Sequence, residues 1–217
     1  MKTDTQLQQD VLAELKWEPS VHAAEIGVEV KDGVVTLAGE VSSFTEKWAA
    51  EKAAQRVSGV MALAIEIEVK LSSLGKRTDA DIARSAQTAL GWSTALPLDA
   101  VKVMVEHGQI TLSGAVDWQF QKQAATDSVR HLSGVVGVLN QMVIEPQVSI
   151  SAVKADIEAA LKRVAKADAR KISVSITGSH VTLSGTVGSW SERELAMTTA
   201  WRTPGVSTVV DSLTLVY

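Results

Sequence analysis

Few residues of this 217-residue chain have the types and spacing that catalysis or metal binding requires. The chain has no cysteine, which excludes disulfides, thiolate nucleophiles and cysteine-ligated metals. Four histidines lack a partner at metal-ligand spacing: His22, His107, His131 and His180. Glu66 and Glu68 lie on one face of an expected strand, where exposure to solvent explains them better than paired acid–base catalysis. We therefore predict a protein that is not an enzyme and uses no metal or cofactor.

Positive charge gathers in one segment of the last third of the chain. Six basic residues occur there: Lys154, Lys162, Arg163, Lys166, Arg170 and Lys171. Because a basic amphipathic helix can lie against an anionic lipid surface, we predict that these residues bind phospholipid. The alternative is a solvated helix face with pairs such as Glu158 and Lys162, which are four residues apart in the favourable order.

The composition is that of a folded protein, with 46% hydrophobic and 21% charged residues. The net charge of −4 gives no reason to expect nucleic acid as a partner, because binding to phosphates needs a basic surface. The first residues resemble no signal peptide, and no apolar run is long enough to span a bilayer. We expect a cytoplasmic chain on this basis, with a periplasmic or envelope-associated location as the alternative.

A tandem repeat organises the chain. The phrase "VVTLAGEV" at Val34 returns as "QITLSGAV" at Gln109 and as "HVTLSGTV" at His180. Other positions recur with the same two offsets, so the sequence predicts three units, at 1–72, 76–147 and 150–217. They are called the first, second and third repeats below. The joints between them, "SSLGKRT" and "EPQVS", are short and typical of turns.

Each repeat has the same expected elements. An amphipathic helix opens it, as in the first repeat, where Leu7, Val11 and Leu15 fall on one face. Two strands follow around a turn such as Asp32-Gly33. A polar helix then begins near Ser43 with a capping-box pattern at Ser43 and Glu46, and a closing strand ends the repeat. The order αββαβ predicts an α+β fold in which two helices cover one face of a three-stranded mixed sheet.

The repeated glycine of the phrase, Gly39, Gly114 and Gly185, could mark either a bound ligand or a backbone constraint. A bulge or a tight exit from the strand, where a side chain would clash, is the interpretation we favour. The phrase is therefore expected to be a structural joint rather than a site.

Comparison of the repeats separates shared tryptophans from unshared ones. Trp17 and Trp92 occupy equivalent positions, and we expect them to anchor the end of the first helix of their repeats. Four others replace residues that are mostly polar in the other repeats: Trp48, Trp118, Trp190 and Trp201. Because a position that is polar elsewhere lies on the surface, we predict that these four contact another repeat, another chain or a membrane.

The pattern "VEVKDGVVTLAGEV", with its alanine-rich second helix and a Gly-Val before the last strand, resembles the BON domain. This is the bacterial osmotic-shock-protein and nodulation domain, here in three tandem copies. The resemblance implies an αββαβ fold without known catalytic residues. It further implies binding to phospholipid or envelope components, osmotic or envelope stress, and in some members transport or secretion. Most members look exported and many have two copies, whereas this sequence shows no leader and has three.

Two functions are expected from these observations. The first is a non-enzymatic BON protein of osmotic or envelope stress that binds anionic phospholipid. The alternative is a transport-associated structural homo-oligomer, ring-like or pore-like. The first repeat has a net charge of −5 and the third has +2, so these ends of two copies can attract each other.

Overall fold

The computed structural model describes residues 2–73, 75–97, 99–145, 157 and 172–216. The first repeat follows the order helix, strand, strand, helix, strand. Its elements are α1 (Asp4–Trp17), η1 (Ala23–Glu25), β1 (Ile26–Lys31), β2 (Val34–Val41), α2 (Phe44–Arg56) and β3 (Ala62–Val69). Helix α1 begins with a capping box between Thr3 and Gln6. Its predicted apolar face is the buried one.

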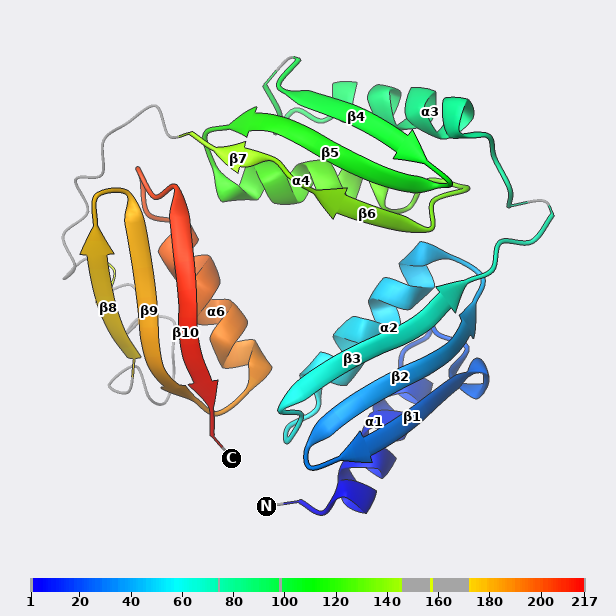
Figure 1. The fold of residues 1–217 in the computed structure, drawn as a ribbon, viewed down its shortest axis with the longest axis vertical. Coiled ribbons are helices and arrows are strands. Elements are labelled where there is room, and N and C mark those ends of the chain that lie inside the picture. Colours follow the sequence, from blue (N-terminus) through cyan, green and yellow to red (C-terminus); the bar gives the residue numbers. More distant parts are fainter. Residues whose placement is uncertain (1, 74, 98, 146–156, 158–171, 217) are drawn as a thin grey trace. The chain divides into compact units, whose positions relative to one another are not determined.

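The sheet of the first repeat is mixed, with β2 in the centre. Strand β1 runs antiparallel to β2, and β3 runs parallel to it. Val35, Leu37 and Val41 of β2 are buried on the face that α1 and α2 cover (Figure 1). Asp32 and Gly33 both have positive φ, +49° and +75°, as a tight two-residue hairpin turn requires. The order and the hairpin are those predicted from the sequence.

Gly39 lies inside β2 and is held there by a close backbone approach. Its φ is +140°, and a Cβ on this residue would lie 2.1 Å from the carbonyl oxygen of Glu25. The equivalent Gly114 and Gly185 have φ of 129° and 119°. The backbone interpretation therefore holds, although the glycine is two residues before the strand's end rather than at an exit.

The second repeat has the same order with one interruption. Its elements are α3 (Asp79–Gly91), β4 (Val101–Glu106), β5 (Gln109–Val116), α4 (Gln119–Val129), β6 (Gly137–Asn140) and β7 (Val143–Ile144). Where the sequence predicts one closing strand, β6 and β7 both pair with β5 and keep the same register. Met142, at the break, is only 2% exposed, so the chain turns an apolar side chain into the core there.

An aspartate at the start of the first helix caps the hairpin turn in both of these repeats. The carboxylate of Asp4 accepts hydrogen bonds from the backbone N–H groups of Asp32 (2.9 Å) and Gly33 (3.1 Å). Asp79 does the same for His107 (2.8 Å) and Gly108 (2.9 Å). These bonds to a carboxylate join the start of the helix to the hairpin turn.

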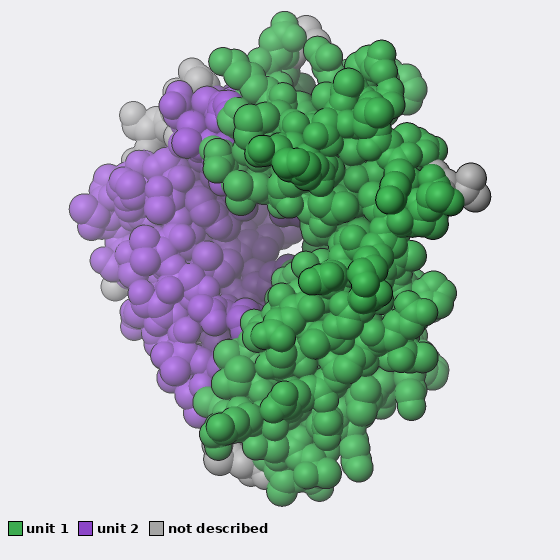
Figure 2. Space-filling view, turned by 45° about the vertical axis from the view of Figure 1, so that its right-hand side comes forward, with its two compact units in different colours: residues 1–113, 124–141 green, residues 114–123, 142–217 purple. Residues whose placement is uncertain are grey.

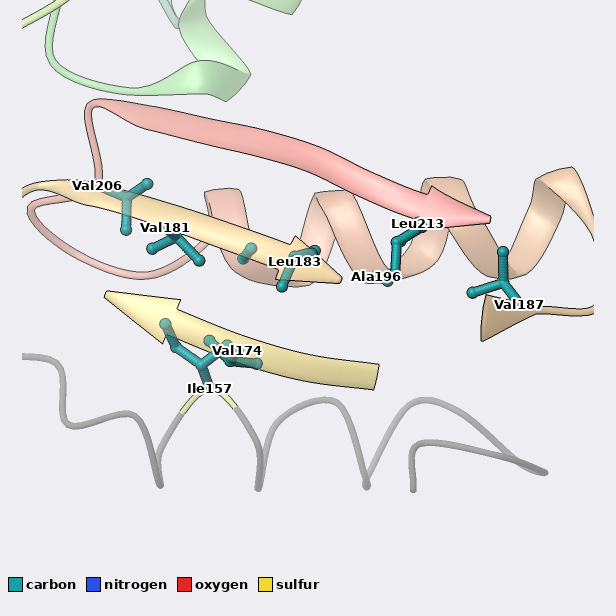
Figure 3. Close-up of a cluster of buried hydrophobic side chains, with 9 residues drawn as sticks. Ile157, Val174, Val181, Leu183, Val187, Ala196, Val206 and Leu213 are labelled. Carbon is teal, nitrogen blue, oxygen red and sulfur yellow. The ribbon is translucent and has the colours of Figure 1, made fainter. Parts of the chain in front are cut away.

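The third repeat is described from its first strand onward, together with Ile157. Its elements are β8 (Ile172–Thr177), β9 (His180–Val187), α6 (Trp190–Trp201) and β10 (Thr208–Leu215), with β9 in the centre of the sheet. Figure 3 shows its core, in which Val174, Val181 and Leu183 of the sheet meet Ala196 of α6. Ile157, only 1% exposed, belongs to the same core.

The three sheets and their helices confirm the predicted α+β class. The chain divides into two compact units, residues 1–113 with 124–141 and residues 114–123 with 142–217 (Figure 2). The first unit holds the whole first repeat and most of the second. The described third repeat belongs to the second unit.

Candidate binding surfaces

The predicted lipid-binding residues cannot be placed. All six basic residues, Lys154, Lys162, Arg163, Lys166, Arg170 and Lys171, lie outside the described residues. Their binding to phospholipid stays a prediction from the sequence.

Trp48 of α2 is half-buried and contacts the second repeat within the first compact unit. The guanidinium carbon of Arg130 lies 3.9 Å from the centre of the Trp48 ring, which is a cation–π distance. The hydroxyl of Thr45 donates to the carbonyl of Arg130 (3.3 Å) and lies 3.2 Å from Nδ1 of His131. The structure thus brings these four side chains together between α2 and the end of α4. An oligomer interface at Trp48 stays a prediction.

Trp118 and Trp190 stand at the starts of the second helices in their repeats. The Trp118 ring lies 6.5 Å, centre to centre, from the ring of Phe120, which is 57% exposed. The Trp190 ring lies 5.1 Å from the guanidinium carbon of Arg193, whose Nε donates to Asp211 (2.6 Å). Trp201 has a different setting, because it is partly buried and packs against the core of the third repeat. An interface role of these residues also stays a prediction.

Trp17 and Trp92 do not anchor their helices, which corrects the expectation from the sequence. Each is 82% exposed. The physical reason is helical phase: each follows the last buried leucine, Leu15 or Leu90, by two residues, and a step of two turns a side chain by about 200°. The spacing of the buried positions alone could have shown this.

A shallow cleft of about 600 Å³ lies beside Trp17. Its other lining residues are Glu14, Lys16, Glu18, Pro19 and Arg56. Arg56, from the end of α2, holds two carboxylates of the first helix region. Its Nε donates to Glu14 and its NH2 to Glu18, both at 2.9 Å. This clamp was not predicted, because it joins residues that are far apart in the sequence.

The clamp is further ordered by Ser20, whose hydroxyl donates to Glu18 at 3.0 Å. Hydrogen bonds from Arg56 and then from Ser20 lower the pKa of Glu18 below its ordinary value. The hydrogen bonds to Glu18 and then to Glu14 raise the pKa of Arg56 further above its ordinary value. Both groups are therefore charged at neutral pH, and their charges compensate each other at the wall of the cleft.

Glu46 is the most buried carboxylate of the described residues, at 4% exposure. Its Oε1 accepts from the backbone N–H of His22 (2.8 Å) and lies 2.8 Å from the Nδ1 atom of His22. Its Oε2 accepts from the N–H and the hydroxyl of Ser42, at 3.1 and 3.0 Å. Ser43 caps α2 as predicted, but Glu46 reaches past it, so the reciprocal half of the expected capping box does not form.

The pKa values of this pair move in opposite directions. Burial tends to raise the pKa of Glu46, but the hydrogen bonds from His22 and Ser42 outweigh burial and leave it below the ordinary value. The carboxylate in turn raises the pKa of His22, first through the hydrogen bond and then through its charge. The pair braces the entry to α2, because the Glu46 carboxylate joins His22 to Ser42.

The sheet faces turned away from the helices differ between the repeats. In the first repeat that face carries Glu29, Glu40, Glu66 and Glu68, which are exposed. The register of the third sheet places hydroxyls on the corresponding face: Ser173, Ser175, Thr177, Thr182, Ser184, Thr186, Thr208, Ser212 and Thr214. Equivalent sheets thus present an acidic surface in the first repeat and a mostly hydroxyl-bearing surface in the third.

Within the described part of the chain, no group of three or more histidine, aspartate or glutamate side chains is placed to hold a metal ion. In that same part, no helix has the length and apolar character to cross a membrane.

Comparison with known proteins decides the family. The sequence model of the BON domain matches residues 3–70, 78–146 and 149–217, which together cover nearly the whole chain. The chain belongs to the BON domain family. The resemblance seen in the repeated phrase is thereby confirmed, and the three copies are BON domains.

One curated relative is Osmotically-inducible protein Y of Escherichia coli (strain K12). It is 29% identical over 143 residues, which is 64% of this chain and 71% of the relative. Two solved structures of CdsD, a structural protein of the type III secretion system of Chlamydia trachomatis, also align. They have TM-scores of 0.27 and 0.26, identities of 15% and 13%, and coverage of 97% and 100% of this chain and of 92% and 100% of theirs.

Proposed function

We propose that this chain is a non-catalytic binding protein of osmotic or envelope stress, and that it associates with anionic phospholipid through its third BON domain. The stress role is supported by the name of the Escherichia coli relative, which refers to osmotic induction. The observation that carries lipid binding is the gathering of six basic residues between 154 and 171 in a chain of net charge −4. Such clusters attract anionic headgroups by about 1 kcal/mol per residue near the surface.

Co-sedimentation with vesicles tests the lipid. The full chain is expected to pellet with vesicles that contain phosphatidylglycerol and to stay in solution with pure phosphatidylcholine. The triple variant Lys162→Glu, Lys166→Glu and Lys171→Glu is expected to bind at least about 100-fold more weakly, because three attractions of about 1 kcal/mol are lost and repulsion is added.

A matched control has the same change in charge at exposed lysines of the first two repeats and the joint between them, Lys31→Glu, Lys76→Glu and Lys102→Glu. This control is expected to keep most of the binding. Equal binding by both triple variants, or none by the unaltered chain, would contradict the proposed site. Cell fractionation then separates action at the cytoplasmic leaflet, which the expected cytoplasmic location predicts, from action in the periplasm.

A second candidate function is a structural homo-oligomer associated with transport. The observation that favours it is the aromatic pair of Trp118 and Phe120, because a ring that is 57% exposed beside a second aromatic ring offers an apolar contact to another chain. Its test is the mass of the protein in solution, for which the expected results are given at the end of the Discussion.

A further inference from the structure

The cleft beside Trp17 has the parts of a ligand-binding site. The indole, at 82% exposure, forms one wall and the Arg56 clamp forms another. Its volume of about 600 Å³ falls within the range of small-molecule sites, although the cleft is shallow. When a flat apolar surface covers a solvent-exposed indole, the free energy falls, because apolar area is removed from water.

The charges in the cleft cancel, which selects the class of ligand. Glu14 and Glu18 are opposed by Arg56 and Lys16. An anionic ligand would have to compete with two carboxylates already bound to the guanidinium at 2.9 Å. A cationic ligand would face Arg56 and Lys16. A neutral ligand meets neither penalty.

The clamp nevertheless keeps hydrogen-bonding capacity. A guanidinium has five N–H donors, and the two bonds of the clamp come from the Nε and NH2 atoms. A carboxylate oxygen accepts more than one hydrogen bond. The cleft therefore offers fixed donors and fixed acceptors next to an aromatic face.

A sugar ring matches this combination. It presents C–H groups on its faces and hydroxyls, which both donate and accept, around its rim. We propose that the cleft beside Trp17 binds a neutral oligosaccharide, with one ring stacked on the Trp17 indole and its hydroxyls bonded to Arg56 and Glu14. This inference is independent of the lipid proposal, since it uses a different repeat and an uncharged ligand.

The second repeat supplies an internal control. Trp92 is as exposed as Trp17, but the positions equivalent to Glu14, Glu18 and Arg56 are Ala89, Ser93 and His131. Trp92 therefore has the aromatic surface without the clamp.

An NMR titration tests the proposal. Maltohexaose and tetra-N-acetylchitotetraose are added separately to the ¹⁵N-labelled full chain, and the indole and backbone N–H signals are followed. At least one of the two sugars is expected to shift the Trp17 signal with a Kd of roughly 1–10 mM, which suits a shallow site. Trp17→Ala is expected to weaken binding at least about tenfold, and Trp92→Ala is expected to leave it unchanged.

The side chain of Arg56 gives a second variant. Arg56→Lys keeps the charge but loses the planar fork, so it is expected to weaken sugar binding while the circular dichroism spectrum stays the same. Inorganic phosphate and choline chloride are expected to leave the Trp17 signal unmoved. The proposal is overturned if neither sugar gives a saturable shift, if the backbone N–H signals of the cleft residues shift as much in Trp17→Ala as in the unaltered chain, or if phosphate or choline moves the Trp17 signal as the sugar does.

Discussion

A single buried carboxylate shows how one residue can brace a BON domain. Glu46 accepts from two backbone N–H groups, those of His22 and Ser42, and so joins the segment before β1 to the start of α2. The second repeat has Gln121 at the equivalent position, and its amide oxygen accepts from Asp117 and Trp118, both at 3.0 Å. An oxygen acceptor is thus the shared requirement, and the negative charge is not.

Removal of that acceptor gives a prediction. Glu46→Ala leaves the N–H groups of His22 and Ser42 without their acceptor, so it is expected to lower the free energy of unfolding by about 2–3 kcal/mol. Glu46→Gln, which copies the second repeat, is expected to cost about half as much. Urea unfolding followed by circular dichroism measures both. Equal stability of Glu46→Ala and the unaltered protein would show that the brace contributes nothing.

The same pair predicts a pH dependence. The pKa of His22 is raised above its ordinary 6.5 in the folded protein, so its contribution is complete below 6.5 and is lost as pH rises through the folded-state pKa. The pKa of Glu46 is lowered from 4.5, so its contribution is present above 4.5 and is lost as pH falls through the folded-state value. The stability lost in His22→Ala should therefore be largest between these limits and shrink toward alkaline pH.

At the scale of elements, the repeated phrase marks a strand whose backbone is constrained. Gly39 combines a φ of +140° with a Cβ position 2.1 Å from the carbonyl oxygen of Glu25. Gly27, on the neighbouring strand, has no positive φ, and a Cβ there would lie 3.5 Å from the carbonyl oxygen of Ala38, an ordinary contact. The two glycines form a matched pair for substitution.

Gly39→Ala is expected to destabilise the first repeat by at least about 2 kcal/mol, because the new methyl group cannot avoid a backbone oxygen. Gly27→Ala is expected to change stability by less than about 1 kcal/mol, since its backbone conformation suits alanine. Thermal unfolding of both variants distinguishes the cases. A larger loss in Gly27→Ala than in Gly39→Ala would refute this account of the phrase.

The elements themselves could be predicted, because their signals are local. The spacing of Leu7, Val11 and Leu15 and the Asp32-Gly33 turn indicate a helix and a hairpin without knowledge of the rest of the chain. The break between β6 and β7 could not be predicted, since it depends on where Met142 fits in the core.

Less of the candidate sites could be predicted from the sequence. The exposure of Trp17 could be predicted from helical phase. Arg56, which lines the same cleft, comes from a helix about forty residues later, and only the fold brings the two residues together. Asp4 and Asp79 share the repeat offset, and comparison of the repeats could have identified them as turn caps. The basic segment of the third repeat remains known by its sequence alone.

At the scale of the whole molecule, the three repeats share a fold and differ in charge. The first is acidic, the third is basic, and the open sheet faces follow no common chemistry. Domains of about 70 residues are marginally stable alone, so contacts with other domains or other chains add to their stability. We therefore expect self-association through opposite charges and exposed aromatic rings.

Light scattering is expected to give a mass above the 23.1 kDa of one chain at low salt, and a smaller mass at high salt, because exposed charges are screened. Trp118→Ala and Phe120→Ala are expected to lower the mass at low salt, whereas Trp92→Ala, an equally exposed indole elsewhere, is not. Trp201→Ala is less informative, since Trp201 packs against its own core and its loss would also disturb folding. A mass of one chain at both salt concentrations would eliminate the oligomer and leave the monomer as the binding unit.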